Sequence, residues 1–329
     1  MKNRRVLVTG GSGFIGSHLV HRLLAEGAQV SVIVRYGSVM KNERLRDCWN
    51  DIRVIEADLR NRGALEAGLR EFPPEVVLHL AAYNHVGQSF TQVEECFDVN
   101  AKGTANLLDT YVDAEKFIYM STSEVYGHQT DVPFIETMCP EPISPYAITK
   151  YAGELYCHMK QRIGGEQSVV VLRPFNTFGP YQSAKAVIPE LIVDCLRGET
   201  IQTTEGEQTR EFNYVDNIVD GLVLAASHPG RLDGVMNLAS GEEVAIRDLV
   251  TKIAEMTDTR SKIEIGALPY RPTEIWRMYA DSTRAWEVIC WKPKVTLENG
   301  LKRTIEWFRE YYRDELGHGE GRFSHKPQW

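Results

Sequence analysis

The stretch Leu7-Val8-Thr9-Gly10-Gly11-Ser12-Gly13-Phe14-Ile15-Gly16-Ser17-His18 decides the fold of this chain. Its glycines Gly10, Gly13 and Gly16 separate an apolar run at 6–8 from a helix-like segment at 15–26. A strand that turns sharply into a helix directs backbone N–H groups at one point, and glycine lets the backbone approach a ligand there. The pattern predicts a site for the pyrophosphate of a dinucleotide. A plain strand–helix connection is the alternative, because turns collect glycine for steric reasons.

The composition of the 329 residues is that of an ordinary globular protein, with 43% hydrophobic and 25% charged residues, and it allows one large or two medium domains. A net charge of −8 and the lack of a basic run argue against nucleic acid as a partner. No apolar stretch approaches the roughly 18 residues of a membrane span. The chain enters its first strand at once, so we expect no signal peptide and a cytoplasmic protein.

The six cysteines, at positions 48, 96, 139, 157, 195 and 290, are scattered without paired spacing. Such a distribution is typical of reduced, mostly structural thiols. We therefore expect no metal site.

Short β-branched runs alternate with helical stretches in the first half of the chain. The runs lie at 30–34, 53–57, 76–80, 117–120 and 169–172. Most are continuously apolar, as parallel strands buried on both faces require. The rhythm predicts an α/β fold with a doubly wound parallel sheet of Rossmann type.

This rhythm breaks after Pro174, which predicts a smaller α/β substrate-binding domain. We expect residues 1–173 to form the dinucleotide-binding domain, with a returning segment at about 210–240. Residues 174–209 and 241–315 would form the second domain, and 316–329 a loosely ordered tail.

Two clusters of polar residues follow the run at 117–120. The first is Ser121-Thr122-Ser123-Glu124-Val125-Tyr126-Gly127, and the second is Ser144-Pro145-Tyr146-Ala147-Ile148-Thr149-Lys150. On a helix, Tyr146 and Lys150 at i and i+4 share one face. A tyrosine with a pKa of about 10 is a poor base at neutral pH, and a nearby ammonium group favours the phenolate.

The same tyrosine–lysine spacing recurs at Tyr156 and at Tyr181, so spacing alone proves little. Tyr156 would lie about 15 Å along a continuous helix from Tyr146 and roughly 80° around it. We expect Tyr156 to pack or to face a partner subunit. Pro145 suits a helix start, which places Tyr146 where a strand-edge cleft would open.

Together, the glycine turn, Thr122 followed by Tyr146-x-x-x-Lys150, and Asn100 in Asp98-Val99-Asn100-Ala101 resemble a known family. It is that of the extended short-chain dehydrogenase/reductases, the NAD(P)-dependent nucleotide-sugar epimerases and dehydratases. The resemblance runs from about residue 4 to residue 310. It implies that Tyr146 takes the proton of a sugar hydroxyl at C4 while a hydride passes to the nicotinamide. Thr122 would hydrogen-bond that oxygen, and Lys150 would hold the nicotinamide ribose and lower the pKa of Tyr146.

The resemblance also implies a set of cofactor contacts. They are Gly10, Gly13, Phe14, Ile15 and Gly16 in the turn, Arg35 and Ser38 after the second strand, Asp58 and Leu59 near the adenine, Leu80, Ala81 and Ala82 at a strand end, and Asn100, Tyr146 and Lys150.

The implied substrate is a nucleotide diphosphate sugar. Its expected contacts are His85, Asn176, Lys185, Val187, Arg210, Arg271 and Glu274. Arg210 and Arg271 resemble a pair that binds the diphosphate, because a planar cation suits phosphate oxygens. Glu274 resembles a contact to the nucleoside ribose. The alternative for both arginines is a solvated surface role.

Glu124 bears most directly on the reaction. A 4-epimerase only oxidises C4 and reduces it from the other face, whereas a 4,6-dehydratase also needs a base for the C5 proton. Thr122-Ser123-Glu124 resembles the Thr-Ser-Glu of GDP-mannose 4,6-dehydratases, and residues 81–90, which include His85, are similar to the same enzymes. Residues 174–189 look more like nucleotide-hexosamine 4,6-dehydratases. We therefore expect a 4,6-dehydratase in which Thr122, Ser123 and Glu124 are catalytic together with Tyr146 and Lys150.

Several other functions stay open. An epimerase would leave Glu124 as a structural carboxylate. Decarboxylases and some 4-ketoreductases also resemble Ser-Glu here, but a clamp for a substrate carboxylate would rest on Arg277 alone. Without an Asp at position 123, the acid that expels water is unassigned, and Glu124 is a candidate for both tasks. A non-catalytic dinucleotide-binding protein is the distant alternative, since such proteins usually lose the tyrosine or the lysine.

The end of the second predicted strand favours NADP over NAD, tightly bound and recycled. An NAD site usually carries an acidic residue there for the ribose 2′-hydroxyl, but this chain has Arg35, with Ser38, Lys41 and Arg44 following. A cation suits a 2′-phosphate. The alternative is a solvent-facing arginine beside NAD.

The family resemblance further implies a homodimer. Its contact would be formed by the helices predicted at 100–111 and 145–162, which would make a four-helix interface.

Overall fold

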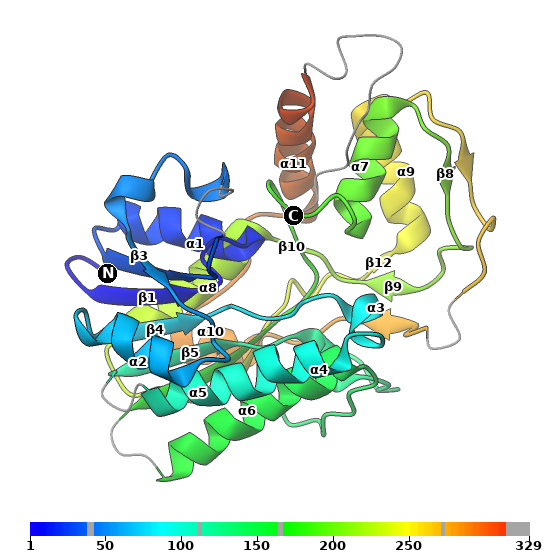
Figure 1. Ribbon diagram of the computed structural model, residues 1–329. Coiled ribbons are helices and arrows are strands. Elements are labelled where there is room, and N and C mark those ends of the chain that lie inside the picture. Colours follow the sequence, from blue (N-terminus) through cyan, green and yellow to red (C-terminus); the bar gives the residue numbers. More distant parts are fainter. Residues whose placement is uncertain (38–42, 111–113, 164–166, 271–273, 314–329) are drawn as a thin grey trace. The chain divides into compact units, whose positions relative to one another are not determined.

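Seven parallel strands form one sheet in the computed structural model (Figure 1), which describes residues 1–37, 43–110, 114–163, 167–270 and 274–313. Their order across the sheet is β11-β6-β5-β4-β1-β2-β3. The bounds are β1 (Arg5–Thr9), β2 (Gln29–Val34), β3 (Arg53–Glu56), β4 (Val76–His79), β5 (Lys116–Met120), β6 (Ser168–Pro174) and β11 (Asp233–Leu238). The doubly wound α/β fold predicted from the sequence is confirmed.

This sheet belongs to the first of two units, which comprises Met1–Pro174, Ile218–Leu238 and Asp281–Lys292. Figure 1 shows α2, α5 and α6 on one face of the sheet and α1 on the other. The helices of this unit are α1 (Phe14–Ala25), α2 (Arg62–Arg70), α3 (Val86–Ser89), α4 (Val93–Cys96), α5 (Gly103–Thr110), α6 (Pro145–Ile163), α10 (Thr283–Ile289) and most of α8 (Val215–Ser227). Short helical turns are η2 (Glu43–Leu45), η3 (Trp49–Asp51) and η5 (Ser123–Tyr126), and η4 (Phe97–Lys102) is a π-helix.

The five inner strands β6, β5, β4, β1 and β2 are buried on both faces along most of their length, which explains their apolar sequences. In the core, Leu7, Val77, Phe117 and Val171 come from four different strands and are fully buried. Since all seven strands are parallel, their carboxyl ends lie along one edge of the sheet, as do the residues that follow them. Ligands of open α/β sheets bind outside this edge.

The second unit comprises Phe175–Asn217, Ala239–Ala280 and Pro293–Trp329, of which the described residues form three helices and small sheets. Its helices are α7 (Val187–Arg197), α9 (Ile246–Thr257) and α11 (Leu297–Tyr311). Its strands are β7 (Thr177–Phe178), β8 (Ile201–Gln202), β9 (Thr209–Arg210), β10 (Asn213–Tyr214), β12 (Val244–Ala245), β13 (Ile263–Glu264) and β14 (Arg277–Met278), and they pair as β10-β7, β13-β8 and β12-β9-β14.

Two segments return to the first unit, whereas the sequence analysis placed a single return at about 210–240. The first, Ile218–Leu238, contains β11. The second, Asp281–Lys292, lies in the part assigned to the substrate-binding domain, and its helix α10 contacts β11. Ala285, Ile289 and Trp291 are buried there. This short segment contains neither a strand-like run nor a glycine turn, so its sequence gives no signal of the second return.

Candidate active site

The predicted glycine turn connects β1 to α1. Gly10 has φ +72°, and a Cβ atom added to it would lie 2.7 Å from the backbone N of Ala81. A Cβ atom added to Gly16 would lie 2.0 Å from the Gly10 carbonyl oxygen. Both positions therefore require glycine for the turn to fold as it does.

The first turn of α1 is open to a ligand. Gly13 is the N-cap and no side chain caps the helix. The first backbone bond of the helix runs from the Ser17 N–H to the Gly13 carbonyl, so the N–H groups of Phe14, Ile15 and Gly16 have no partner within the helix. An uncapped helix start of this kind suits an anion.

The residues predicted to contact the adenosine half of the cofactor follow β2 and β3. Arg35 is exposed at the end of β2. Asp58 accepts two bonds from the Arg60 guanidinium, Nε to Oδ1 at 2.9 Å and Nη2 to Oδ2 at 2.7 Å. The bond from Arg60, with a contribution from the charge of Arg35, lowers the pKa of Asp58. Leu59 is buried behind it. Ser38 lies outside the described residues.

The strand end at Leu80, Ala81 and Ala82 is tied to the glycine turn and to Asn100. The Ala81 N–H donates to Thr9 Oγ1 at 3.1 Å, beside Gly10. Asn100, in the π-helix η4, accepts from the Tyr83 N–H at 2.7 Å and donates to Thr149 Oγ1 at 3.0 Å. The Asn100 amide thus joins the β4 loop to α6, the helix that carries Tyr146.

Thr122 and Tyr146 meet at the carboxyl end of β5. The Thr122 side chain caps η5 by accepting from the Glu124 N–H at 3.3 Å. Burial raises the pKa of Tyr146 to about 12, while the nearby Thr122 hydroxyl lowers it and the charge of Glu124 raises it. The structure therefore brings Thr122, Glu124 and Tyr146 near one another. Ser123, between Thr122 and Glu124 in the sequence, is buried.

Lys150 lies one helical turn after Tyr146 and is 2% exposed. Its Nζ donates to the Met120 carbonyl at 2.7 Å and lies 4.2 Å from the centroid of the Tyr119 ring. Burial lowers the pKa of Lys150 to about 7. The Lys150 ammonium group is directed at the Met120 carbonyl, and its effect on the pKa of Tyr146 stays a prediction.

The model of the family described as "GDP-mannose 4,6 dehydratase" matches residues 7–304, which is most of the chain and includes every residue just described. The chain belongs to this family.

Relatives within the family carry out different reactions on nucleotide sugars. The dTDP-D-glucose 4,6-dehydratase of Bos taurus is 31% identical over 334 residues, covering 94% of this chain and 90% of that protein. The crystal structure of UDP-glucose 4-epimerase from Thermotoga maritima with UDP-glucose has a TM-score of 0.86 at 32% identity, covering 93% and 99% of the two chains. DesIV, a dTDP-glucose 4,6-dehydratase from Streptomyces venezuelae with NAD bound, has a TM-score of 0.84 at 28% identity, covering 95% and 99%. Family membership establishes an enzyme of the nucleotide-sugar dehydratase and epimerase family and leaves the individual reaction open.

The predicted substrate residues of this family member lie mostly in the second unit. Arg210 Nη2 and Glu274 Oε1 form an ion pair at 2.7 Å, and Arg210 Nη1 donates to the Ile275 carbonyl at 2.6 Å. Asn176 Nδ2 donates to the Glu211 carbonyl at 3.0 Å. Arg210 and Glu274, predicted separately as diphosphate and ribose contacts, thus lie side by side.

The other substrate candidates are exposed. Lys185 and Val187 lie at the start of α7. His85 belongs to the first unit, where it is the N-cap of α3 and its ring lies 6.0 Å from that of Tyr83. Arg271 lies outside the described residues.

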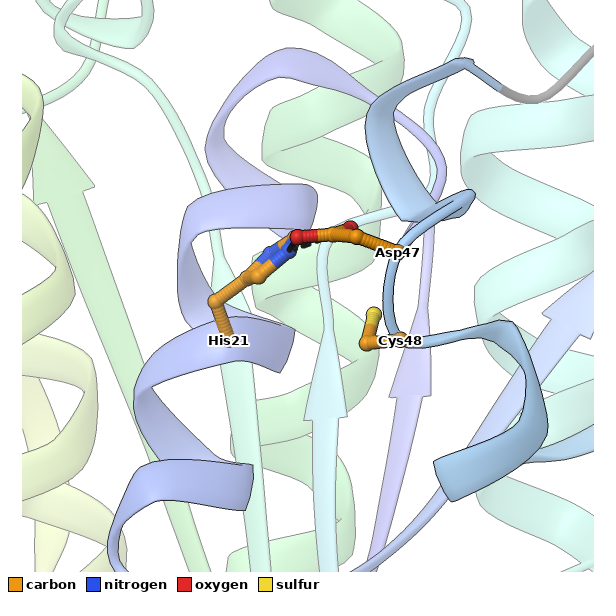
Figure 2. Close-up of side chains that lie close together, drawn as sticks. All are labelled: His21, Asp47 and Cys48. Atoms are coloured by element: carbon orange, nitrogen blue, oxygen red, sulfur yellow. Dashed lines mark hydrogen bonds and ion pairs between the residues drawn. The ribbon is translucent and has the colours of Figure 1, made fainter.

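One cluster of metal-ligating residue types lies beside the glycine turn, on α1 and the loop after η2. Figure 2 shows His21, Asp47 and Cys48. His21 Nδ1 contacts the Ser17 carbonyl at 2.8 Å, and a carbonyl only accepts, so this nitrogen carries a proton. Nε2 then contacts both Asp47 oxygens, at 3.0 and 3.1 Å. These contacts hold the loop to α1, and the Cys48 thiol is directed to the Leu45 carbonyl.

That loop carries a cation that the sequence analysis named only in passing. Arg44 Nη1 donates to the Ser12 carbonyl at 3.2 Å, inside the glycine turn. Its signal in the sequence was its place after β2 together with Arg35.

Among the described residues, no helix is long and apolar enough to cross a membrane.

Proposed function

We propose that the protein is a nucleotide-sugar 4,6-dehydratase. The observation that carries the proposal is the position of Glu124, which lies in the turn capped by Thr122 and near enough to Tyr146 for its charge to raise the pKa of the phenol. A carboxylate at this place can remove a second proton from a sugar whose C4 hydroxyl contacts Tyr146. An epimerase needs no such second base.

The glycine turn fits the dinucleotide that this chemistry needs. The uncapped start of α1 presents its N–H groups. A side chain at Gly16 would collide with the turn itself, and one at Gly10 with the backbone of Ala81. When bound, a nicotinamide cofactor supplies the hydride acceptor for oxidation at C4 and the hydride donor for the closing reduction.

The side chains of the chain then move the protons. Tyr146, as the phenolate, accepts the proton of the C4 hydroxyl, and Thr122 hydrogen-bonds the same oxygen. The resulting 4-keto group makes the C5 proton acidic, and Glu124 removes it. That proton leaves with the C6 hydroxyl as water, so Glu124 serves first as base and then as acid. The Lys150 ammonium favours the phenolate when it is protonated.

Arg277 weakens the case for a decarboxylase. Its guanidinium binds both oxygens of Glu243, Nε to Oε1 at 2.8 Å and Nη2 to Oε2 at 2.7 Å. A clamp for a substrate carboxylate would have to break this pair first. The epimerase remains the second candidate, since the Thermotoga maritima epimerase superposes on most of the chain.

Mass spectrometry tests the proposal. The purified protein, supplied with NADP and NAD, is incubated with dTDP-, UDP-, GDP- and CDP-hexoses, and with UDP-glucuronate. We expect a product that has lost one water from at least one hexose. A product of unchanged mass with altered stereochemistry would identify an epimerase, and loss of carbon dioxide would identify a decarboxylase.

We further propose that NADP is preferred over NAD. Arg35 follows β2 directly, at the position where NAD enzymes usually carry an acid, and Arg44 donates a hydrogen bond to the glycine turn. Two cations near the expected adenosine ribose favour a 2′-phosphate. The preference differs from that of DesIV, whose structure contains NAD.

Binding measurements with both dinucleotides test this preference. Arg35→Asp is expected to weaken NADP at least about tenfold, the equivalent of one charge-assisted bond, while leaving NAD unchanged or tighter. Arg46→Ala is the matched control, because Arg46 is exposed on the same loop. Equal affinities for NADP and NAD in the wild-type protein would overturn the proposal.

We also propose a homodimer formed through α6 and the helix segment beside it. Ile148, Leu155, Met159 and Ile163 are exposed at spacings of seven, four and four, which places an apolar stripe on one face of α6. Phe97 is 43% exposed on η4, which contacts α6. An apolar surface of this extent is typical of a protein interface.

Size-exclusion chromatography with multi-angle light scattering tests the dimer. The wild-type protein is expected at twice the mass of the chain, and Leu155→Lys combined with Met159→Lys at the mass of one chain. Ile265→Lys, at an exposed apolar residue of the second unit, is the control and is expected to stay dimeric. A wild-type protein with the mass of one chain would refute the dimer.

A further inference from the structure

The buried ion pair between Glu154 and Arg173 lies close in the chain to Lys150 and has no part in the proposed mechanism. Glu154, on α6, is fully buried, and Arg173, on β6, is 2% exposed. Arg173 Nη2 and Glu154 Oε2 are 2.6 Å apart, and Nε and Oε1 are 3.0 Å apart. The pair is bidentate and shielded from water.

Glu154 also accepts a hydrogen bond from the Ser121 hydroxyl. Ser121 is the residue before Thr122, and its N–H donates to the Leu172 carbonyl of β6 at 2.7 Å. The carboxylate therefore joins α6 to the carboxyl ends of β5 and β6, at the place where Thr122 meets Tyr146.

Stability is a weak explanation for such a pair. Removing two charges from water costs several kcal/mol per ion, and well-packed apolar residues of similar volume often stabilise a core equally well. The pair therefore calls for another role.

Lys150 is the group on which the charge of Glu154 can act, because it lies one turn before Glu154 on the same face of α6. The titratable groups that act on its ammonium come from the elements around it: Tyr119 on β5, His79 on β4, Cys96 on α4, and Cys157 on α6. Burial holds the pKa of His79 at about 3 and raises the pKa values of both cysteines, so none of these groups carries a charge at neutral pH. Among the described residues that act on Lys150, Glu154 is the one carboxylate.

We infer that Glu154 is a positioning residue whose buried negative charge keeps Lys150 an ammonium ion, with Arg173 and Ser121 holding that charge in place. Burial lowers the pKa of Lys150 to about 7, so the lysine stands near the point where it would lose its proton, and Glu154 opposes that loss. The consequence for catalysis rests on the proposed function: a neutral Lys150 could not favour the Tyr146 phenolate.

The titration of Lys150 itself tests the inference without any assay of activity. Protein labelled with ¹³C at the lysine ε-carbons is titrated by NMR, and the Lys150 signal is assigned by its absence in Lys150→Met. Glu154→Gln is expected to lower the midpoint of Lys150 by about one to two pH units, the effect of one nearby opposite charge.

Two further variants separate the charge from a structural role. Ser121→Ala removes one hydrogen bond to the same carboxylate and keeps its charge, so the Lys150 midpoint is expected to stay at the wild-type value. Glu154→Gln combined with Arg173→Gln avoids an unpaired buried arginine and is expected to give an intermediate midpoint, and it replaces the single variant if that one fails to fold.

A midpoint unchanged in both Glu154 variants would overturn the inference, as would an equal shift in Ser121→Ala. Turnover gives the second readout: because Lys150 acts as the ammonium ion, the alkaline limb of the pH–rate profile should move to lower pH in Glu154→Gln, and the maximal rate should fall. If the wild-type protein turned over no nucleotide sugar, the proposed function would fail, but the NMR midpoints would still decide the role of Glu154.

Discussion

Two tyrosine–lysine pairs with the same spacing lie on α6, and their surroundings differ completely. Tyr146 and Lys150 lie near the start of the helix, where the phenol meets Thr122 and the ammonium donates to a strand-end carbonyl. Ten residues later, the Tyr156 hydroxyl donates to Asp109 Oδ1 at 2.8 Å, and Lys160 Nζ pairs with the same carboxylate at 2.6 Å.

The two pairs share their spacing and differ in their position relative to the sheet edge, and the proposed chemistry depends on that position. Asp109 holds the Tyr156 proton, and burial together with that bond raises the pKa of Tyr156. Tyr156 is thus a fastening between α5 and α6. Tyr146 instead has the Thr122 hydroxyl and the Glu124 carboxylate near it, and the proposed proton transfer to and from a sugar uses both groups.

The largest expected difference between the pairs is in turnover. Tyr146→Phe is expected to lower kcat by about 10²–10⁴-fold, the usual contribution of a positioned acid or base. Tyr156→Phe should leave kcat within about twofold, because it removes only the part-buried hydrogen bond to Asp109. Steady-state rates on the substrate found in the screen check this, and similar losses in both variants would contradict the distinction.

The carboxylates beside the two tyrosines should separate in the same way. Glu124→Gln is expected to slow water loss by at least about 10²-fold while the nicotinamide is still reduced on mixing with substrate, because oxidation at C4 does not use Glu124. Asp109→Asn should keep full turnover and lose about 1 kcal/mol of unfolding free energy, measured in urea. A Glu124→Gln enzyme that eliminates water at the wild-type rate would remove Glu124 from the mechanism.

The lysines should differ in how stability depends on pH. Burial lowers the pKa of Lys150 from its ordinary 10.5 to about 7, so between these values the unfolded chain binds more protons than the folded protein. The free energy of unfolding should therefore rise with pH, by up to about 1.4 kcal/mol per pH unit from this group. Lys150→Met is expected to remove this slope between pH 7 and 9, and Lys160→Met to retain it. Parallel slopes in all three proteins would show that Lys150 is not perturbed.

Much of the fold follows from local sequence. The glycine turn and the apolar strands predict the sheet because each signal is contained in a few consecutive residues. Within the turn, Gly16 is required by its contact with the Gly10 carbonyl, and Gly10 by its positive φ. The meeting of Thr122 and Tyr146 was also predictable, since both follow or face the carboxyl end of β5.

The buried charges were not predictable. Glu154 and Arg173 are ordinary residues of a helix and a strand, 19 positions apart, and only the packing of α6 on β6 joins them. The lowered pKa of Lys150 depends on burial by several elements at once, which no spacing reveals. Likewise, the return of α10 to the first unit rests on contacts with β11 that leave no motif in the sequence.

The central claim is that Glu124 removes a proton from C5 of the sugar, and turnover in D₂O tests it most directly. A 4,6-dehydratase takes the C5 proton away and the product regains one from solvent, so we predict a product that has lost one water and carries one deuterium at C5. A product with unchanged mass and no deuterium would contradict the claim and leave the protein an epimerase.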